Sequence, residues 1–312
     1  MALDPANVWS AWTFEPGVIV PVAISALWYG LGVRALWRSA GRGRGIRAPH
    51  IWSFFGGLIT ILVALVSPID AMGDDLFSAH MTQHLLLILV AAPLIVLGEP
   101  LLPMLWAIPH DARRDLTHWW MRSTPTRAVV VFIVSPAVAW ALHMAALFFW
   151  HIPAPYGWAL DNEAVHALEH FCFLSTAVLF WWAVLQPTGR RRLSYGMSVV
   201  YVSTAGLLMS ALGAILTLAR YPWYVGHLTT TAAWHLTPLQ DQQLAGVIMW
   251  VPASIVYVGA ACWFFVKWLE TDAPREFEYH SRDNRAAALH TENRPSMDVP
   301  IRSALPETRD AT

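Results

Sequence analysis

The chain has 312 residues, of which 56% are hydrophobic and only 13% are charged, and it contains 18 tryptophans. This composition is too apolar for a soluble domain of this length. The formal net charge of −1 gives no basic excess, and we expect no nucleic-acid partner. The sequence therefore predicts an all-α, polytopic membrane protein in contact with the lipid bilayer.

Seven apolar stretches are each long enough to cross a hydrocarbon core of ~30 Å as a helix. They lie near residues 17–37, 50–66, 81–98, 128–150, 164–185, 196–219 and 244–268. Prolines interrupt the third stretch and the residues after it. We expect this helix to end near Gly98 and residues 101–122 to form an interfacial segment. The predicted fold is a transmembrane helix bundle of about seven spans.

Arginines concentrate in alternate connections between these stretches, and this placement predicts the orientation. The basic connections contain Arg34, Arg38, Arg42, Arg44 and Arg47, then Arg113, Arg114, Arg122 and Arg127, then Arg190, Arg191 and Arg192. By the positive-inside rule, the N-terminus lies outside and the C-terminus inside. We expect residues 1–270 to form the membrane domain and the polar residues 271–312 to form a disordered cytoplasmic tail.

Eight of the 13 histidines lie at or near the predicted outer ends of the spans. They are His80, His84, His143, His151, His166, His170, His227 and His235. His227 and His235 lie in an outer loop, and we interpret them first as surface histidines, while local additions and an entry site for metal stay open. The other six lie on three spans. Such polar groups are costly in lipid unless they are paired, face a cavity or bind a metal, so we expect metal coordination.

The spacing of these histidines favours a shared site. His80 and His84 are four residues apart, as are His166 and His170, so each pair projects from one face of a helix. Two such faces can converge on one ion. His151 ends the fourth span, where the helix C-terminus favours a cation, and His143 lies two turns deeper on the same helix.

Neutral imidazole suits copper, zinc, iron and nickel, and thioethers select Cu(I). Met81 and Met144 each follow a candidate histidine, which makes copper, as Cu(I), the favoured metal. Asp241 starts the last span, and two roles stay open: an N-cap of that helix or a carboxylate that orients a ligating imidazole. Glu169 has the same ambiguity.

Four short motifs in order carry a resemblance to a known family. They are Met81 to Leu87, His143 to Pro153 with Tyr156, His166 to His170, and Asp241 to Gly246. Over residues 12–269 the chain resembles the integral-membrane CtaG-type cytochrome c oxidase assembly factors. The resemblance implies a non-catalytic role in assembling a haem–copper oxidase. The metal-site residues that it carries over are His80, His84, His143, His151, His166, His170 and Asp241.

The resemblance also implies the partners and the location. We expect copper handling for the catalytic subunit of a haem–copper oxidase, a periplasmic copper donor, and a multi-pass protein of a bacterial-type plasma (inner) membrane. No haem is expected. Three other interpretations stay open: a membrane di-iron oxygenase similar to desaturases, whose metal faces the cytoplasm, a membrane cytochrome with histidine-ligated haem, and a transporter.

Overall fold

The computed structural model describes residues 5–185 and 193–292, and for residues 272–292 it describes only the backbone. This part of the chain is helical and contains no strand. It divides into two compact units, Met1–Phe265 and Val266–Thr312. The predicted all-α class is confirmed.

Six helices are long and apolar enough to cross a membrane. They are α1 (Pro16–Ala40), α2 (Ala48–Leu65), the continuous helix Phe77–Leu97, α11 (Glu163–Leu185), α12 (Tyr195–Thr217) and the 238–271 part of α13 (Pro238–Glu292). A bent pair, α8 (Thr124–Ile133) and α9 (Pro136–Trp150), makes a seventh if it is one span. The predicted spans are confirmed by these helices, and the side that each end faces stays a prediction.

The bend between α8 and α9 measures 60° and has a local cause. Pro136 starts α9, and Ser135 before it has extended backbone geometry, with φ −67° and ψ 141°. A proline ring disfavours helical geometry in the residue that precedes it, so the helix stops and restarts at this point.

The third span changes its helical geometry along its length. It begins as α4 (Phe77–Leu85), continues as a π-helical segment (Leu86–Ala91) and ends as α5 (Ala92–Leu97), with Gly98 as C-cap. The predicted end near Gly98 is confirmed. Two features accompany this change of helical geometry. Pro93 has no N–H to bond the preceding turn. The carbonyl of Ile88 accepts a hydrogen bond from the indole of Trp181 at 2.8 Å. The π segment begins two residues after His84, and such segments often accompany functional sites.

The segment expected at the interface folds as two helices, α6 (Leu101–Ala107) and α7 (His110–Arg122). α6 packs against α1. The indole of Trp28 donates to the carbonyl of Met104 at 2.9 Å, and the hydroxyl of Tyr29 donates to that of Gly98 at 2.9 Å. An interfacial position for these helices stays a prediction.

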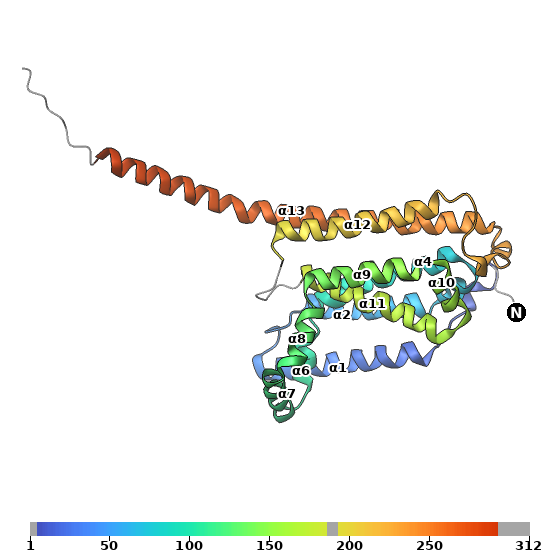
Figure 1. Cartoon of the computed structure of the whole chain (residues 1–312). Helices are drawn as coiled ribbons and strands as arrows, with labels where there is room; N and C mark the ends of the chain where they lie inside the picture. The colour runs from blue at the N-terminus through green and yellow to red at the C-terminus, as the bar shows by residue number, and fades with distance from the viewer. Residues whose placement is uncertain (1–4, 186–192, 293–312) are drawn as a thin grey trace, which may run out of the picture. The chain divides into compact units, whose positions relative to one another are not determined.

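Two further short helices lie at the opposite end of the bundle from α6 and α7. They are α3 (Pro68–Asp75) and α10 (Pro153–Asp161), and they lie where α4 and α11 begin and α9 ends (Figure 1). The arginine-rich connections after α1 and around α7 lie at the other end. Residues 190–192, the third arginine cluster, lie outside the described residues.

Small residues bring α12 and α13 close together. A Cβ on Gly246 would lie 2.6 Å from the carbonyl oxygen of Gly213, so the two backbones almost touch at this point. The hydroxyls of Ser210 and Ser254 lie 2.9 Å apart along the same interface. This crossing fixes the start of α13, where Asp241 lies.

The backbone differs from the prediction after residue 270. We expected disorder over 271–312, but α13 is helical as far as Glu292. Residues 275–292 contain many arginine, glutamate and alanine residues, which are strong helix formers, and this composition outweighs the polar character from which we predicted disorder. Residues 293–312 lie outside the described residues.

Candidate metal centre

The two histidine pairs lie face to face, on α4 and α11. The ring of His80 stacks on that of His166 with centroids 5.1 Å apart, and the ring of His84 lies 5.3 Å from that of His170. One nitrogen from each of His80, His84 and His170 lies within 4.8 Å of the others, which is close enough for one metal ion. The structure thus brings together four of the predicted ligands, and their binding of metal stays a prediction.

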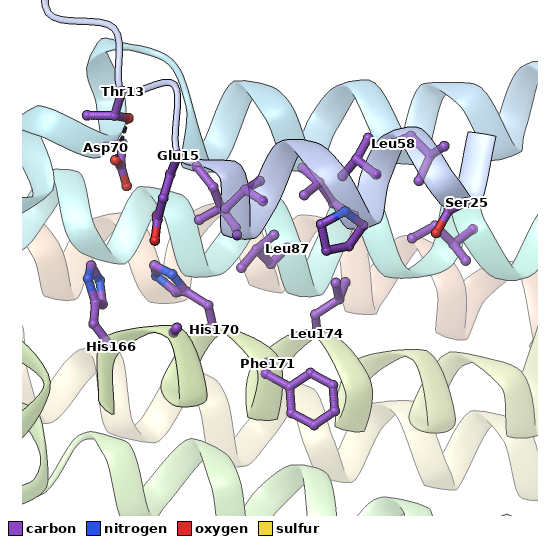
Figure 2. Close-up of a pocket in the computed structure, with 18 of the residues that line it drawn as sticks. Thr13, Glu15, Ser25, Leu58, Asp70, Leu87, His166, His170, Phe171 and Leu174 are labelled. Atoms are coloured by element: carbon purple, nitrogen blue, oxygen red, sulfur yellow. Dashed lines mark hydrogen bonds between the residues drawn. The ribbon is translucent and has the colours of Figure 1, made fainter. Parts of the chain in front are cut away.

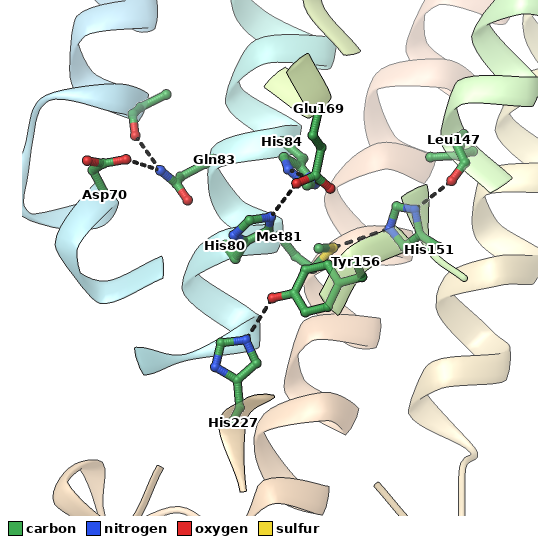
Figure 3. A network of polar contacts seen from close by, with 11 residues as sticks. Asp70, His80, Met81, Gln83, His84, Leu147, His151, Tyr156, Glu169 and His227 are labelled. Atoms are coloured by element: carbon green, nitrogen blue, oxygen red, sulfur yellow. Dashed lines mark hydrogen bonds and ion pairs between the residues drawn. The ribbon is translucent and has the colours of Figure 1, made fainter. Parts of the chain in front are cut away.

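Glu169 lies among these histidines (Figure 3). Its side chain is fully buried, with one carboxylate oxygen 3.4 Å from Nε2 of His80 and the other 3.7 Å from Nε2 of His84. Its carboxylate also forms a second possible metal-binding group with His80 and His166. From the sequence, two roles stay open for Glu169, and it is not among the predicted site residues. The available signal was a carboxylate inside an apolar span, directly before a histidine.

Several buried polar atoms of this cluster have no hydrogen-bond partner among the described residues. They are both ring nitrogens of His80 and His84, Nε2 of His166 and His170, and both oxygens of Glu169. Buried polar groups are normally paired, because leaving one unpaired costs about 1–3 kcal/mol. So many unpaired atoms that face one another fit a bound metal cation, which would accept electron pairs from the imidazoles and balance the carboxylate.

His151 lies beside this cluster and faces a sulfur atom. Its Nδ1 lies 2.6 Å from the carbonyl oxygen of Leu147, and a carbonyl can only accept, so Nδ1 carries the proton. In the neutral ring, Nε2 is then an unprotonated acceptor, and it lies 3.3 Å from Sδ of Met81 (Figure 3). The ring of His151 is 6.4 Å from that of His84. Two lone-pair donors therefore face each other next to the cluster.

His143 lies apart from the other predicted ligands. Its Nδ1 is 3.2 Å from the hydroxyl of Thr176, and its ring packs at 5.1 Å from that of Phe180. The described contacts of this ring include none of the other histidines. The structure therefore does not bring His143 into the cluster.

Asp241 lies in the first turn of α13, but it caps a different helix, α4. Its carboxylate accepts from the backbone N–H of Phe77 at 2.7 Å and from the N–H and hydroxyl of Ser78 at 3.1 and 2.5 Å. These bonds fix the start of α4, one turn before His80. Asp241 therefore lies outside the cluster and positions the helix that supplies two of its histidines.

The interpretation of His227 as a surface histidine is wrong. Its side chain is only 2% exposed, and its Nε2 lies 2.7 Å from the hydroxyl of Tyr156. Tyr156 in turn packs against His80, with ring centroids 5.1 Å apart. The folding of the outer loop over α4 buries His227, which the loop's local sequence does not indicate. His235 is exposed, as predicted.

Carboxylates lie next to the cluster, in and around α3. Asp70 accepts from the amide of Gln83 at 2.8 Å and from the hydroxyl of Thr13 at 2.6 Å. Desolvation of this partly exposed side chain, with the negative charges of Asp70, Asp75 and Glu163, raises the pKa of Asp74 to about 6. This end of the bundle is therefore strongly electronegative.

Comparison with known families gives one match over most of the chain. The family model described as cytochrome c oxidase caa3 assembly factor (Caa3_CtaG) matches residues 27–271. The match covers all of the cluster residues and the spans that supply them, and it confirms the resemblance found in the short motifs.

Similar proteins are found in mycobacteria. An uncharacterized protein of Mycobacterium tuberculosis and one of Mycobacterium bovis are each 24% identical over 296 residues, which is 89% of this chain and 43% of the relative. One from Mycobacterium leprae is 22% identical over 299 residues, covering 86% of this chain and 41% of that protein. The chain thus spans less than half the length of these relatives. No solved structure matches significantly.

The capping role of Asp241 predicts a loss of stability without a loss of ligands. Asp241→Ala leaves two backbone N–H groups and a hydroxyl without their buried acceptor, and we expect a cost of about 2–3 kcal/mol. Asp241→Asn keeps one acceptor oxygen and should lose about half as much. Thermal unfolding of the metal-free protein, followed by tryptophan fluorescence, measures both. If Asp241 were a metal ligand, the result would be the reverse: the substitutions would leave the stability of the metal-free protein unchanged and would weaken metal binding.

The raised pKa of Asp74 predicts a pH-dependent effect on stability. Because the folded pKa of about 6 exceeds the ordinary value of 3.8, ionisation of Asp74 destabilises the fold as pH rises from about 4 to 6, and the penalty persists above pH 6. Asp74→Asn should therefore stabilise the protein by about 1 kcal/mol at pH 8, allowing for solvent screening, and by nothing at pH 4. Equal unfolding midpoints for variant and wild type at both pH values would contradict this account.

Proposed function

The chain belongs to the cytochrome c oxidase caa3 assembly factor family, and from this premise we propose that it binds copper for a haem–copper oxidase. The proposed site is the cluster formed by His80, His84, His166, His170 and Glu169. The observation that carries the proposal is the set of buried nitrogen and oxygen atoms that these residues turn toward one another and that have no hydrogen-bond partner among the described residues.

The charge of the cluster favours a cation. Among the described residues, Glu169 has no lysine or arginine partner, and its nearest charged or titratable neighbours are His80 and His84. An ionised carboxylate in a low-dielectric interior costs several kcal/mol unless a positive charge lies beside it. A metal ion would supply that charge and bind the imidazole nitrogens at the same time.

The neighbouring sulfur favours copper over zinc. Imidazole and carboxylate ligands alone suit several metals, but thioether sulfur selects Cu(I). Met81 is 1% exposed, and its sulfur faces the unprotonated nitrogen of His151 beside the cluster. We propose that this pair is a second, softer binding position that the ion reaches from the histidine and glutamate cluster. Copper is the cargo in this scheme, not a resident cofactor.

The destination and the sidedness are further parts of the proposal. The cluster lies at the end of the bundle opposite the arginine-rich connections, which the positive-inside rule assigns to the cytoplasm (Figure 1). Copper would then arrive from the periplasmic side, supplied by a soluble copper donor. It would leave to the catalytic subunit of the oxidase in the same plasma (inner) membrane, which holds a buried copper centre.

Removing two ligands should greatly weaken copper binding. We expect purified wild-type protein to retain stoichiometric copper after loading with Cu(I) and desalting, and His84→Ala/His170→Ala to lose at least tenfold in affinity. The matched control is His110→Ala/His118→Ala, since both of these histidines are exposed at the other end of the bundle. Metal analysis and a visible spectrum measure the result. Bound iron, a haem band, or equal copper in both variants would contradict the proposal.

Replacing Met81 should weaken the binding of soft metal ions only. Met81→Leu keeps the volume and apolar character of the side chain and removes the thioether, so we expect about tenfold weaker Cu(I) binding, or ~1.4 kcal/mol. Zn(II) binding at the cluster should not change. Met144→Leu is the control, because Met144 is buried in the apolar core. Competition titrations with a coloured chelator give both affinities, and an equal effect of the two substitutions would exclude a role for the sulfur.

A further inference from the structure

A cavity of about 710 Å³ lies against the histidine cluster, between α1, α2, α3, the third span and α11 (Figure 2). One end of it is lined by carboxylates and histidines. The rest is lined by apolar side chains, including Leu58, Leu87 and Leu174. The polar end lies where α1 and α11 begin and where α3 connects α2 to the third span. It therefore lies at the same end of the bundle as the cluster.

Four carboxylates line the polar end of this cavity: Glu15, Asp70, Asp74 and Glu163. Glu15 is the residue before α1, Glu163 is the first residue of α11, and the two aspartates lie in α3. Among the described residues, none of the four forms an ion pair, and no lysine or arginine lines the cavity. The negative charge of this end is therefore not balanced within that part of the protein.

Two histidines of the cluster connect the carboxylates to the proposed copper site. His166 and His170 line the cavity, and Figure 2 shows their rings directed toward Glu15 and Asp70. The side chain of His170 is only 8% exposed, and its Nε2 has no hydrogen-bond partner among the described residues. His170 is thus a buried, unpartnered donor that faces both the cavity and the rings of His80 and His84.

We propose that this cavity is the vestibule through which a small metal cation reaches the cluster. Glu15, Asp70, Asp74 and Glu163 attract and hold the ion, and His166 and His170 are the first imidazoles that it meets. The inference rests on the proposed function, because it gives the route to the same site. It assigns to the four carboxylates a role in the rate of metal capture, separate from the ligands that retain the metal.

The apolar walls of the cavity strengthen the attraction of a cation by the four carboxylates. A cleft that carries one sign of charge between low-dielectric walls focuses the electric field and raises the association rate of an oppositely charged ion by 10-fold to ~10³-fold. The apolar side chains along α1, α2 and the third span provide such walls. The same field repels a metal carried as an anionic chelate, so the vestibule favours a free or cationic form of the ion.

The test is the association rate of Ag(I), a redox-stable substitute for Cu(I), with the full-length protein in nanodiscs of zwitterionic lipid. Stopped-flow tryptophan fluorescence in chloride-free buffer follows the binding. We expect Glu15→Gln and Glu163→Gln each to slow association about threefold, and the double variant about tenfold, with a weaker dependence on ionic strength. The amount of Ag(I) bound at saturation should stay at the wild-type value.

The control is Asp161→Asn, which removes one exposed carboxylate from α10, at the same end of the bundle but outside the cavity lining. It should leave the association rate within error of wild type. Equal rates for Asp161→Asn and the double glutamine variant would overturn the vestibule and leave the cluster as a binding site. A wild-type protein that binds no Ag(I) at all would overturn the proposed function and the vestibule together.

Discussion

A carboxylate buried between membrane helices needs a positive charge beside it, and this requirement organises the end of the bundle around Glu169. The side chain is fully buried, and the groups nearest to its oxygens are the imidazoles of His80 and His84. Neutral imidazoles cannot balance its charge. In the proposed function, a cation bound between the carboxylate and the histidines would balance this charge and would also satisfy the ring nitrogens that have no hydrogen-bond partner among the described residues. Under the proposed function, the stability of this region and its activity would depend on the same ion.

The groups that hold the cluster in place come from distant parts of the chain. Asp241, at the start of α13, caps α4 before His80, and the side chain of Asn162 caps α11 by accepting from the N–H groups of two residues in its first turn. Gln83 lies between the two histidines of α4 and donates to the carbonyl of Ala64 and to Asp70, which ties α4 to α2 and α3. These bonds set the height and rotation of both helices, and rigid placement of this kind is what a metal site requires.

Hydropathy and spacing predict much of this structure. Long apolar stretches bounded by charged connections define the spans, and the four-residue spacing of His80 and His84 puts their rings on one helix face. Contacts between distant segments are not visible in local patterns. Asp241 bonds residues more than 160 positions away, so its target could not be identified from its own surroundings. Glu169 could be recognised as unusual in an apolar span, but its place between two histidine pairs depends on how α4 and α11 face each other. His227 is buried by the fold of its loop, and His143 contacts Thr176 and Phe180, which lie more than one turn beyond His170 along α11.

The central claim, that histidines and a buried glutamate form a metal site, is tested most directly by anomalous X-ray diffraction at the copper edge from crystals of the copper-loaded protein. The account predicts an anomalous peak between His80, His84 and His170, within bonding distance of a Glu169 oxygen. A second, weaker peak between His151 and Met81 is expected where the ion moves on. Loaded crystals that show peaks only at exposed histidines such as His110 and His118, or no peak near Glu169, would contradict the account.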